Sequence, residues 1–294
     1  MQSEKTMTIF TPTYNRAYIL QRVYNSLCIQ TDLDFEWLIV DDGSEDDTEY
    51  LVKEWIEQKV IPIRYYKQEN GGKQRAHNKG VEMSNTELFV CLDSDDYVTR
   101  DFVEQHIKKW NEVKSDKTIA GIVSLKGYES GKPTGTSIPQ NLEKTTLMNL
   151  YKKLKFRGDA TMMYRTELLK AFPFVVEPDE KFIGEEYVYN QIDRKYQMAV
   201  LPEVLMIVEY LEDGYSRNVR RVTKENPKGY IRLKKQSIEY AETWYERFIQ
   251  TILYLVGCRI SGEKNPLKNL PYKFLGVVGY LPAWLAWIVF YKDA

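Results

Sequence analysis

The 294-residue sequence has little cysteine and histidine and almost no net charge. Its three cysteines, Cys28, Cys91 and Cys258, stand far apart and show neither the spacing of a disulfide framework nor that of a metal site. This pattern favours core packing in a reducing cytosol. The net charge of −1, from 41 basic and 42 acidic residues, identifies no partner.

The sequence also lacks an apolar signal-peptide core, because residues 1–6 are polar, and we therefore expect no secretion. It contains no internal repeat and no low-complexity segment. A chain of this length forms one large domain or two smaller ones.

The first 112 residues alternate short apolar runs with amphipathic segments. Strands are predicted at 7–10, 35–40, 63–66 and 88–92, and helices at 17–29 and 73–83 among others. Repeated βα units of this length favour right-handed crossovers and an α/β fold with a parallel sheet.

The apolar run Leu88–Leu92 ends in three carboxylates, Asp93, Asp95 and Asp96. Ligands of open α/β sheets bind outside the carboxyl ends of the strands, and clustered carboxylates favour Mg²⁺ or Mn²⁺. A solvated turn that caps the next helix is the alternative. An EF-hand is excluded, because tyrosine and valine stand where its loop needs a ligand and a glycine.

A second acidic turn, Asp41–Ser44, follows the strand at 35–40, and Lys73 follows the Gly71–Gly72 pair at the start of a helix. Backbone N–H groups and a lysine at a helix start suit a diphosphate. The alternatives are a local turn cap for Asp41 and a solvated side chain for Lys73.

The C-terminal part differs in composition. Residues 217–235 hold eight basic residues against Glu225 alone, and Phe274–Tyr291 contains no charge but is interrupted by Gly276, Gly279 and Pro282. A helix of that length spans about 27 Å. We expect it to lie in a membrane interface beside the basic region, with burial in a soluble fold or spanning as alternatives. No nucleic-acid motif accompanies the basic residues, so no nucleic-acid partner is expected.

Five motifs occur in order: TPTYN at 11–15, VDDGS at 40–44, NGGK at 70–73 leading to NKG at 78–80, LDSDD at 92–96 and GEE at 184–186. Together they resemble the family 2 inverting glycosyltransferases, closely over 7–112 and less closely through Ser216. The resemblance implies the glycosyltransferase A fold, a Rossmann-like, mostly parallel sheet flanked by helices. It implies a catalytic domain at 1–218, with a nucleotide-binding half at 1–112 and an acceptor-binding half at 113–218. A helical, membrane-associating extension at 219–294 follows.

The resemblance further implies a UDP-sugar donor and a Mn²⁺ or Mg²⁺ ion. Asp95 would be the principal metal ligand and Asp93 an auxiliary one. Asp42 is assigned to the uracil N3 hydrogen, because a carboxylate only accepts hydrogen bonds. The residues implied to hold the donor are Pro12, Thr13, Tyr14, Asp41, Asp42, Lys73, Asp93 and Ser216.

Inversion in one step needs a base on the acceptor side. Many relatives carry Glu-Asp where this chain has Glu185 and Glu186, so Glu186 is the first choice for the base and Glu185 the second. The alternative is that both are acids favoured by a helix N-terminus.

The function implied is transfer of a sugar to a glycan or polyprenyl-diphosphate-linked acceptor in bacterial surface polysaccharide synthesis, such as capsule or lipopolysaccharide. The site of action would be the inner face of the cell membrane, and an oligomer is compatible with the sequence. The alternative is a non-catalytic nucleotide-sugar or glycan-binding protein on the same fold. A sugar nucleotidyltransferase is disfavoured, because TPTYN replaces the glycine-rich loop expected after its first strand.

Overall fold

The computed structural model describes residues 5–209 and 218–292. The chain divides into two compact units, the first formed by Met1–Pro173 and Val188–Tyr210 and the second by Phe174–Tyr187 and Leu211–Ala294. The chain passes from the second unit back to the first within helix α6 (Glu186–Asp193).

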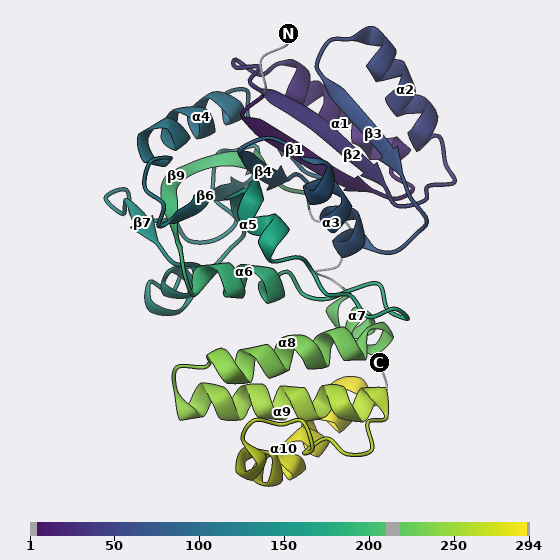
Figure 1. The fold of residues 1–294 in the computed structure, drawn as a ribbon, viewed down its shortest axis with the longest axis vertical. Coiled ribbons are helices and arrows are strands. Elements are labelled where there is room, and N and C mark those ends of the chain that lie inside the picture. Colours follow the sequence, from purple (N-terminus) through teal and green to yellow (C-terminus); the bar gives the residue numbers. More distant parts are fainter. Residues whose placement is uncertain (1–4, 210–217, 293–294) are drawn as a thin grey trace. The chain divides into compact units, whose positions relative to one another are not determined.

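A nine-stranded mixed sheet forms the centre of the described part of the first unit (Figure 1). The order across the sheet is β3-β2-β1-β4-β8-β6-β9-β5, and β7 pairs with β9. The pairs β1–β2, β2–β3, β1–β4 and β6–β9 are parallel, and β4–β8, β6–β8, β5–β9 and β7–β9 are antiparallel. The strands are β1 (Met7–Thr13), β2 (Phe35–Asp41), β3 (Ile63–Lys67), β4 (Leu88–Cys91), β5 (Tyr97–Val98), β6 (Ile119–Gly127), β7 (Lys144–Thr145), β8 (Ala160–Arg165) and β9 (Gln197–Ile207).

Helices cover both faces of this sheet. They are α1 (Ala17–Cys28), α2 (Thr48–Gln58), α3 (Lys73–Met83), α4 (Phe102–Val113), α5 (Thr166–Ala171) and α6, with the π-helical turn η1 (Asn149–Lys153). Because alternate side chains of a strand point to opposite faces, neighbouring residues of β1 pack against different helices. Ile9 joins the core cluster that contains Leu20 of α1, whereas Phe10 stacks on Phe89 and meets His77 of α3 edge-on.

Helix α3 approaches the sheet closely because a glycine faces β1. A Cβ atom on Gly80 would lie 2.5 Å from the Phe10 ring, so a larger residue there would push the helix away from the sheet. The approach places the first turn of α3 beside the carboxyl ends of β1 and β2, where the predicted site residues lie.

Helices form the second unit within its described residues: α7 (Val219–Glu225), α8 (Pro227–Tyr240), α9 (Trp244–Ser261) and α10 (Lys273–Tyr291). Helices α9 and α10 each pack on their neighbour in the chain, around buried residues such as Ile238, Leu255 and Ala283. The segment Phe174–Tyr187 belongs to this unit because the Glu180 carboxylate accepts the N–H groups of Lys228 and Gly229, at 2.7 Å each, in the first turn of α8.

The parallel βα arrangement predicted for residues 7–112 is confirmed through β4, and the predicted bounds of the helix at 73–83 are those of α3. Beyond β4 the sheet is mixed, because β8 enters antiparallel between β4 and β6. The helical extension predicted at 219–294 is broken between α8 and α9, because Ala241 has extended backbone and Thr243 caps α9 by accepting the Glu246 N–H at 3.1 Å. The domain boundaries at 112 and 218 stay predictions, since the structure instead groups Phe174–Tyr187 with the helical unit.

Candidate active site

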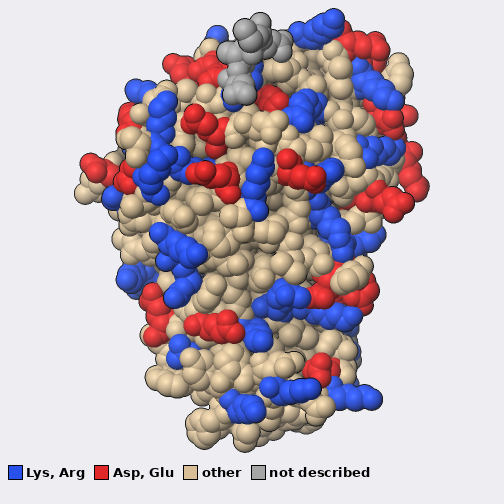
Figure 2. All heavy atoms as spheres, viewed as in Figure 1, with Lys and Arg blue, Asp and Glu red and all other residues tan. Residues whose placement is uncertain are grey.

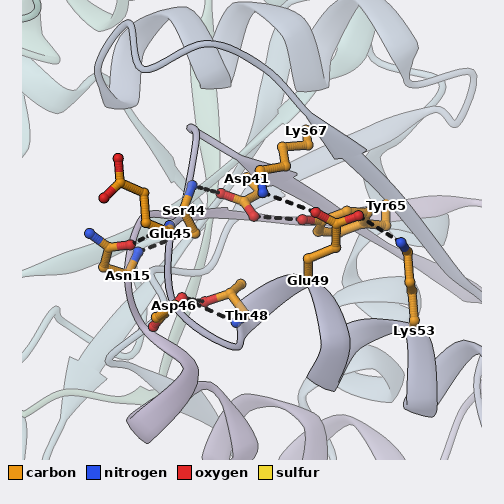
Figure 3. Close-up of polar contacts among 10 residues, drawn as sticks. All are labelled: Asn15, Asp41, Ser44, Glu45, Asp46, Thr48, Glu49, Lys53, Tyr65 and Lys67. Carbon is orange, nitrogen blue, oxygen red and sulfur yellow. Dashed lines mark hydrogen bonds and ion pairs between the residues drawn. The ribbon is translucent and has the colours of Figure 1, made fainter.

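Two acids stand at the carboxyl end of β2, Asp41 as its last residue and Asp42 directly after it. Asp41 is fully buried, and its two carboxylate oxygens accept hydrogen bonds from the Ser44 N–H at 2.7 Å and from the Tyr65 hydroxyl at 2.5 Å (Figure 3). Burial, and then the hydrogen bond to Asp41, raise the pKa of Tyr65, so this hydroxyl remains a donor. Asp41 therefore closes the Asp41–Ser44 turn and fixes it to β3.

Asp42 shapes the next turn. Its Oδ1 accepts hydrogen bonds from the Gly71 N–H at 2.9 Å and from Gln68 Nε2 at 2.7 Å, and its Oδ2 accepts the Gly72 N–H at 2.7 Å. A carboxylate offers about four lone-pair sites. Three are thus used inside the protein, and about one is left for a ligand. Gly72 has φ of +93°, a conformation that favours glycine, and the Asp42 carboxylate holds it there.

The turn after β1 is tied to the turn after β2. Asn15, at φ of +53°, donates its N–H to Ser44 Oγ at 2.9 Å and accepts the Glu45 N–H at 2.8 Å (Figure 3). Thr13 pairs with Asp41 across the parallel strands. Pro12 is half-buried on the same strand end and Tyr14, which follows it, is exposed. The structure thus brings together the five residues predicted at this strand edge: Pro12, Thr13, Tyr14, Asp41 and Asp42.

Buried polar atoms without partners lie at this edge. Among the described residues, Thr13 Oγ1 and both amide atoms of Gln74 have no hydrogen-bond partner, although Thr13 is 3% exposed and Gln74 1%. A buried unsatisfied polar group costs about 1–3 kcal/mol, so such atoms point to a missing ligand or water. Sequence reasoning missed Gln74, although a polar residue one position after Lys73 on the sheet-facing side of α3 could have indicated it.

The acids after β4 have lysine partners. Lys73 Nζ lies 2.7 Å from Asp93 Oδ1, and Lys126 Nζ of β6 lies 2.7 Å from Asp96 Oδ2. Burial acts to raise the pKa of Asp93, but Lys73 and Lys126 outweigh it and bring that pKa to about 2. Burial prevails at Asp96 and raises its pKa to about 6 in spite of Lys126. Lys126 is a second residue that sequence reasoning missed, because β6 lies far from β4 in the chain.

Asp95 differs from the two acids beside it. Within the part of the chain that the structure describes, its carboxylate has no hydrogen bond or ion pair with another residue. Burial and the neighbouring Asp93 raise its pKa, and Arg16 and Lys73 act in the opposite direction. An unpaired, partly buried carboxylate beside a second acid fits a cation ligand.

The described residues contain no group of three or more histidine, cysteine, aspartate or glutamate side chains that could hold a metal ion. A divalent ion at Asp95 would thus take most of its ligands from water or from a phosphate-bearing molecule. Mg²⁺ commonly binds this way, through one or two carboxylates plus phosphate oxygens. The residues present therefore fit the predicted metal.

Glu185 and Glu186 lie in the second unit, at the start of α6. Glu186 is exposed and Glu185 half-buried. The Glu186 carboxylate folds back over Gly184, where a Cβ atom would lie 2.5 Å from Glu186 Oε2. Burial lowers the pKa of Lys234 in α8, and the charge of Glu186 acts against that shift. Lys234 is thus a positive neighbour of the predicted base. Ser216 lies outside the described residues.

Residues 8–172, more than half of the chain, match the model of the family described as Glycosyl transferase family 2. Glycosyltransferase GlyA of Streptococcus pneumoniae serotype 4 is 27% identical over 204 residues, which are 65% of this chain and 28% of that protein. The GalNAc(5)-diNAcBac-PP-undecaprenol beta-1,3-glucosyltransferase of Campylobacter jejuni is 25% identical over 185 residues, 61% of this chain and 57% of the relative. The chain thus spans less than two thirds of the length of these curated relatives.

Two solved structures share the fold. The crystal structure of S. aureus TarS 1-349 in complex with UDP-GlcNAc has a TM-score of 0.60 and 16% identity, over 97% of this chain and 92% of that one. The mannosyltransferase PcManGT from Pyrobaculum calidifontis, in complex with GDP-Man and Mn2+, has a TM-score of 0.57 and 16% identity, over 98% and 76% of the two chains. The α/β architecture with a central sheet is therefore shared with these proteins.

Proposed function

Because the chain belongs to glycosyl transferase family 2, we propose that it transfers a sugar from a UDP-sugar donor to an acceptor hydroxyl with inversion. The observation that carries the proposal is Asp95, whose carboxylate is unpaired while Asp93 and Asp96 are each bound to a lysine. That arrangement leaves one acid at the carboxyl edge of the parallel strands for a metal-bound diphosphate.

The donor would bind over the carboxyl ends of β1 and β2. Pro12, Thr13 and Tyr14 would contact the nucleoside, and Thr13 Oγ1 would gain the partner that it lacks. Asp42 keeps about one lone pair for the uracil N3 hydrogen, and Asp41 holds the turn beside it. TarS was crystallised with UDP-GlcNAc, which supports a uridine donor.

Asp95, with Asp93 as auxiliary, would hold a Mn²⁺ or Mg²⁺ ion, and PcManGT was crystallised with Mn2+. When bound, such an ion neutralises charge that develops on the departing diphosphate. Lys73 is 2.7 Å from Asp93 and would exchange part of that ion pair for a phosphate oxygen. Ser216 is proposed to contact the same diphosphate.

Glu186 is proposed as the base that takes the proton of the acceptor hydroxyl while that oxygen attacks the anomeric carbon. Its exposure and its position over Gly184 favour this choice over the half-buried Glu185, which remains second. Lys234 is a positive neighbour of this carboxylate.

The acceptor is proposed to be a glycan or a polyprenyl-diphosphate-linked glycan of a bacterial surface polysaccharide, such as capsule or lipopolysaccharide. The Campylobacter relative, whose name contains an undecaprenol-linked glycan, supports that class. Helix α10 is proposed to associate with the inner face of the cell membrane. Within the described residues it alone is long and apolar enough to cross a membrane, and only 22% of its most apolar window is buried.

The test is a thermal-shift screen of UDP-, GDP- and CDP-sugars with and without Mn²⁺, followed by detection of released nucleotide and of product mass. A donor present at a hundred times its dissociation constant should stabilise the folded chain by about 2.7 kcal/mol. We expect a UDP-sugar to give the largest shift, only with metal, and Asp95→Asn to abolish the metal dependence. Equal shifts with and without metal would contradict the proposed role of Asp95. Binding of a donor without turnover on any acceptor would favour a non-catalytic binding protein.

A further inference from the structure

Helices α7–α10 of the second unit and the loops between them carry a strong positive charge, whereas its segment Phe174–Tyr187 holds five acidic residues and one basic residue. Residues 218–292 hold 13 basic and 5 acidic residues, a formal charge of +8, although the whole chain is at −1. Figure 2 shows basic side chains among uncharged residues over helices α8–α10, with fewer acidic ones. A charge imbalance of this size raises the local concentration of anions.

Part of this charge lines a hollow of about 730 Å³ within the second unit. Four cationic side chains line it, from α8 and from the segment after α9: Lys228, Arg232, Lys235 and Lys264. Two of the four are bound to acids, since Arg232 donates to Glu177 at 3.0 Å from Nε and Lys228 pairs with Asp179.

The other two cations, Lys235 and Lys264, have no hydrogen bond or ion pair with any described residue. The side chains of Asn265 and Asn269 add amide donors to the same lining, and Glu263 already accepts the Asn265 N–H at 3.0 Å. Unpaired ammonium groups and N–H donors are the groups with which proteins bind phosphate.

An apolar surface adjoins this hollow. A second hollow of about 200 Å³ shares Cys258, Gly262 and Glu263 with the first and is lined on its other side by Tyr280 and Trp284 of α10. Helix α10 turns Gly276, Gly279 and Ala283 inward and leaves large apolar side chains in solvent. These exposed residues include Phe274, Val277, Leu281, Leu285 and Val289.

We propose that the larger hollow binds the phosphate of an anionic amphiphile whose hydrocarbon part lies on the exposed face of α10. A site for free phosphate would gain nothing from the adjoining apolar surface, whereas a lipid phosphate uses both. The placement of the hydrocarbon part on α10 rests on the membrane contact proposed for that helix. A monomeric amphiphile tests this placement without a membrane. The proposal involves the second unit alone, so its failure would not affect the proposed donor site.

The experiment is isothermal titration of the full chain with dihexanoyl phosphatidic acid below its micelle concentration. Dihexanoyl phosphatidylcholine and inorganic pyrophosphate are the comparison ligands. We expect the phosphatidic acid to bind at least tenfold more tightly than either. The double variant Lys235→Gln/Lys264→Gln should weaken that binding at least tenfold, which is about 1.4 kcal/mol. The matched double variant Lys268→Gln/Lys273→Gln removes the same charge outside the hollow and should bind within twofold of the unmodified chain.

Trp284→Ser separates the two halves of the site, because it should weaken the phosphatidic acid at least fivefold and leave pyrophosphate unchanged. Circular dichroism establishes that each variant is folded. If the double variant Lys235→Gln/Lys264→Gln does not fold, the single variant Lys264→Gln, in an exposed loop, is titrated in its place. Binding of pyrophosphate as tight as that of phosphatidic acid would overturn the proposal in favour of a free-phosphate site. Equal losses in the two lysine pairs, or no binding of the amphiphile, would also overturn it.

Discussion

The two acidic turns that follow β2 and β4 look alike in sequence but differ in what their carboxylates bind. The carboxylates of Asp41 and Asp42 accept hydrogen bonds from neighbouring N–H groups and from the Tyr65 hydroxyl. After β4, two acids are bound to lysines and Asp95 is bound to no other described residue. The carboxylates of the first turn fix the neighbouring backbone, whereas the second turn contains a carboxylate, Asp95, that can bind a cation.

The difference follows from what stands opposite each turn. The turn after β2 faces the backbone of residues 68–72, where the N–H groups of Gly71 and Gly72 donate to the Asp42 carboxylate. The turn after β4 faces Lys126, which comes from β6, two strands along the sheet and beyond β8, and Lys73 at the start of α3. Substitution of Asp42 should therefore lower stability, whereas substitution of Asp95 should lower activity.

The largest effect is expected for Asp95→Asn. A unit charge pair about 4 Å apart is worth about 4 kcal/mol at an effective dielectric of 20, on the order of a thousandfold in rate. Turnover of the best UDP-sugar with saturating Mn²⁺ should fall by that factor. The free energy of unfolding in urea should stay the same or rise, because Asn is not repelled by Asp93.

Asp47→Asn is the matched control, since Asp47 is exposed at the start of α2 and makes no capping hydrogen bond. Its turnover should stay within twofold of the unmodified chain. If Asp95→Asn keeps more than a tenth of the activity, or unfolds more easily than the control, the contrast between the two turns is wrong.

Lys126→Met tests the second turn as a set of coupled charges. Removing one partner of a buried ion pair costs about 3 kcal/mol, and we expect that loss in urea unfolding at pH 8. Burial already raises the pKa of Asp96 to about 6, and without Lys126 that pKa should rise further. A carboxyl whose folded pKa lies above its unfolded value of about 3.9 gains stability as the pH falls through the folded pKa. The deficit of the variant should therefore shrink between pH 8 and pH 5.

The double variant Lys126→Met/Asp96→Asn is the control for this explanation, because it removes the stranded carboxyl together with the lysine. It should recover at least half of the lost stability and should lose the pH dependence. A deficit of equal size at both pH values would mean that packing of the lysine stem, rather than its charge, stabilises the fold at this turn.

The sequence predicted the parallel half of the sheet well because β1, β2 and β4 are mostly buried, largely apolar runs and each is followed by a polar turn. It did not predict β8, since a strand that enters antiparallel between β4 and β6 pairs with residues about 40 and 75 positions away in the chain. The same long separation hid Lys126. Residues at the ends of consecutive strands could be grouped, because parallel strands present their carboxyl ends at one edge.

The sequence could not predict which hydrogen-bond or ion-pair partners each carboxylate has. Asp41, Asp42, Asp93 and Asp95 all follow strands, and only the backbone of residues 68–72 and the two lysines separate their surroundings. The identity of a residue fixes its charge, but the N–H groups and cations that satisfy it come from elsewhere in the fold.

Asp42→Asn tests the first turn. An asparagine keeps one acceptor oxygen and places an NH₂ group against one of the two glycine N–H groups, so one buried donor loses its partner. Loss of a hydrogen bond to a charged group and the unsatisfied donor together should lower the free energy of unfolding by about 2 kcal/mol. Urea unfolding checks this value. A loss of less than 0.5 kcal/mol, about the effect of an ordinary surface substitution, would mean that the turn at 68–72 holds its shape without the carboxylate.

The smallest effect is expected for Gln74→Met, which tests whether the amide of Gln74 contacts the donor. The amide of Gln74 is 1% exposed and has no described partner, so methionine should leave the stability unchanged or raise it by up to about 1 kcal/mol. If the amide serves the donor, the dissociation constant of the best UDP-sugar should rise about fivefold. Gln21→Met, on the exposed surface of α1, is the matched control and should change neither quantity. A loss of stability without a change in donor affinity would instead identify Gln74 as a purely structural residue, hydrogen-bonded through buried water. Thr13 would then be the polar group at this edge that contacts the donor.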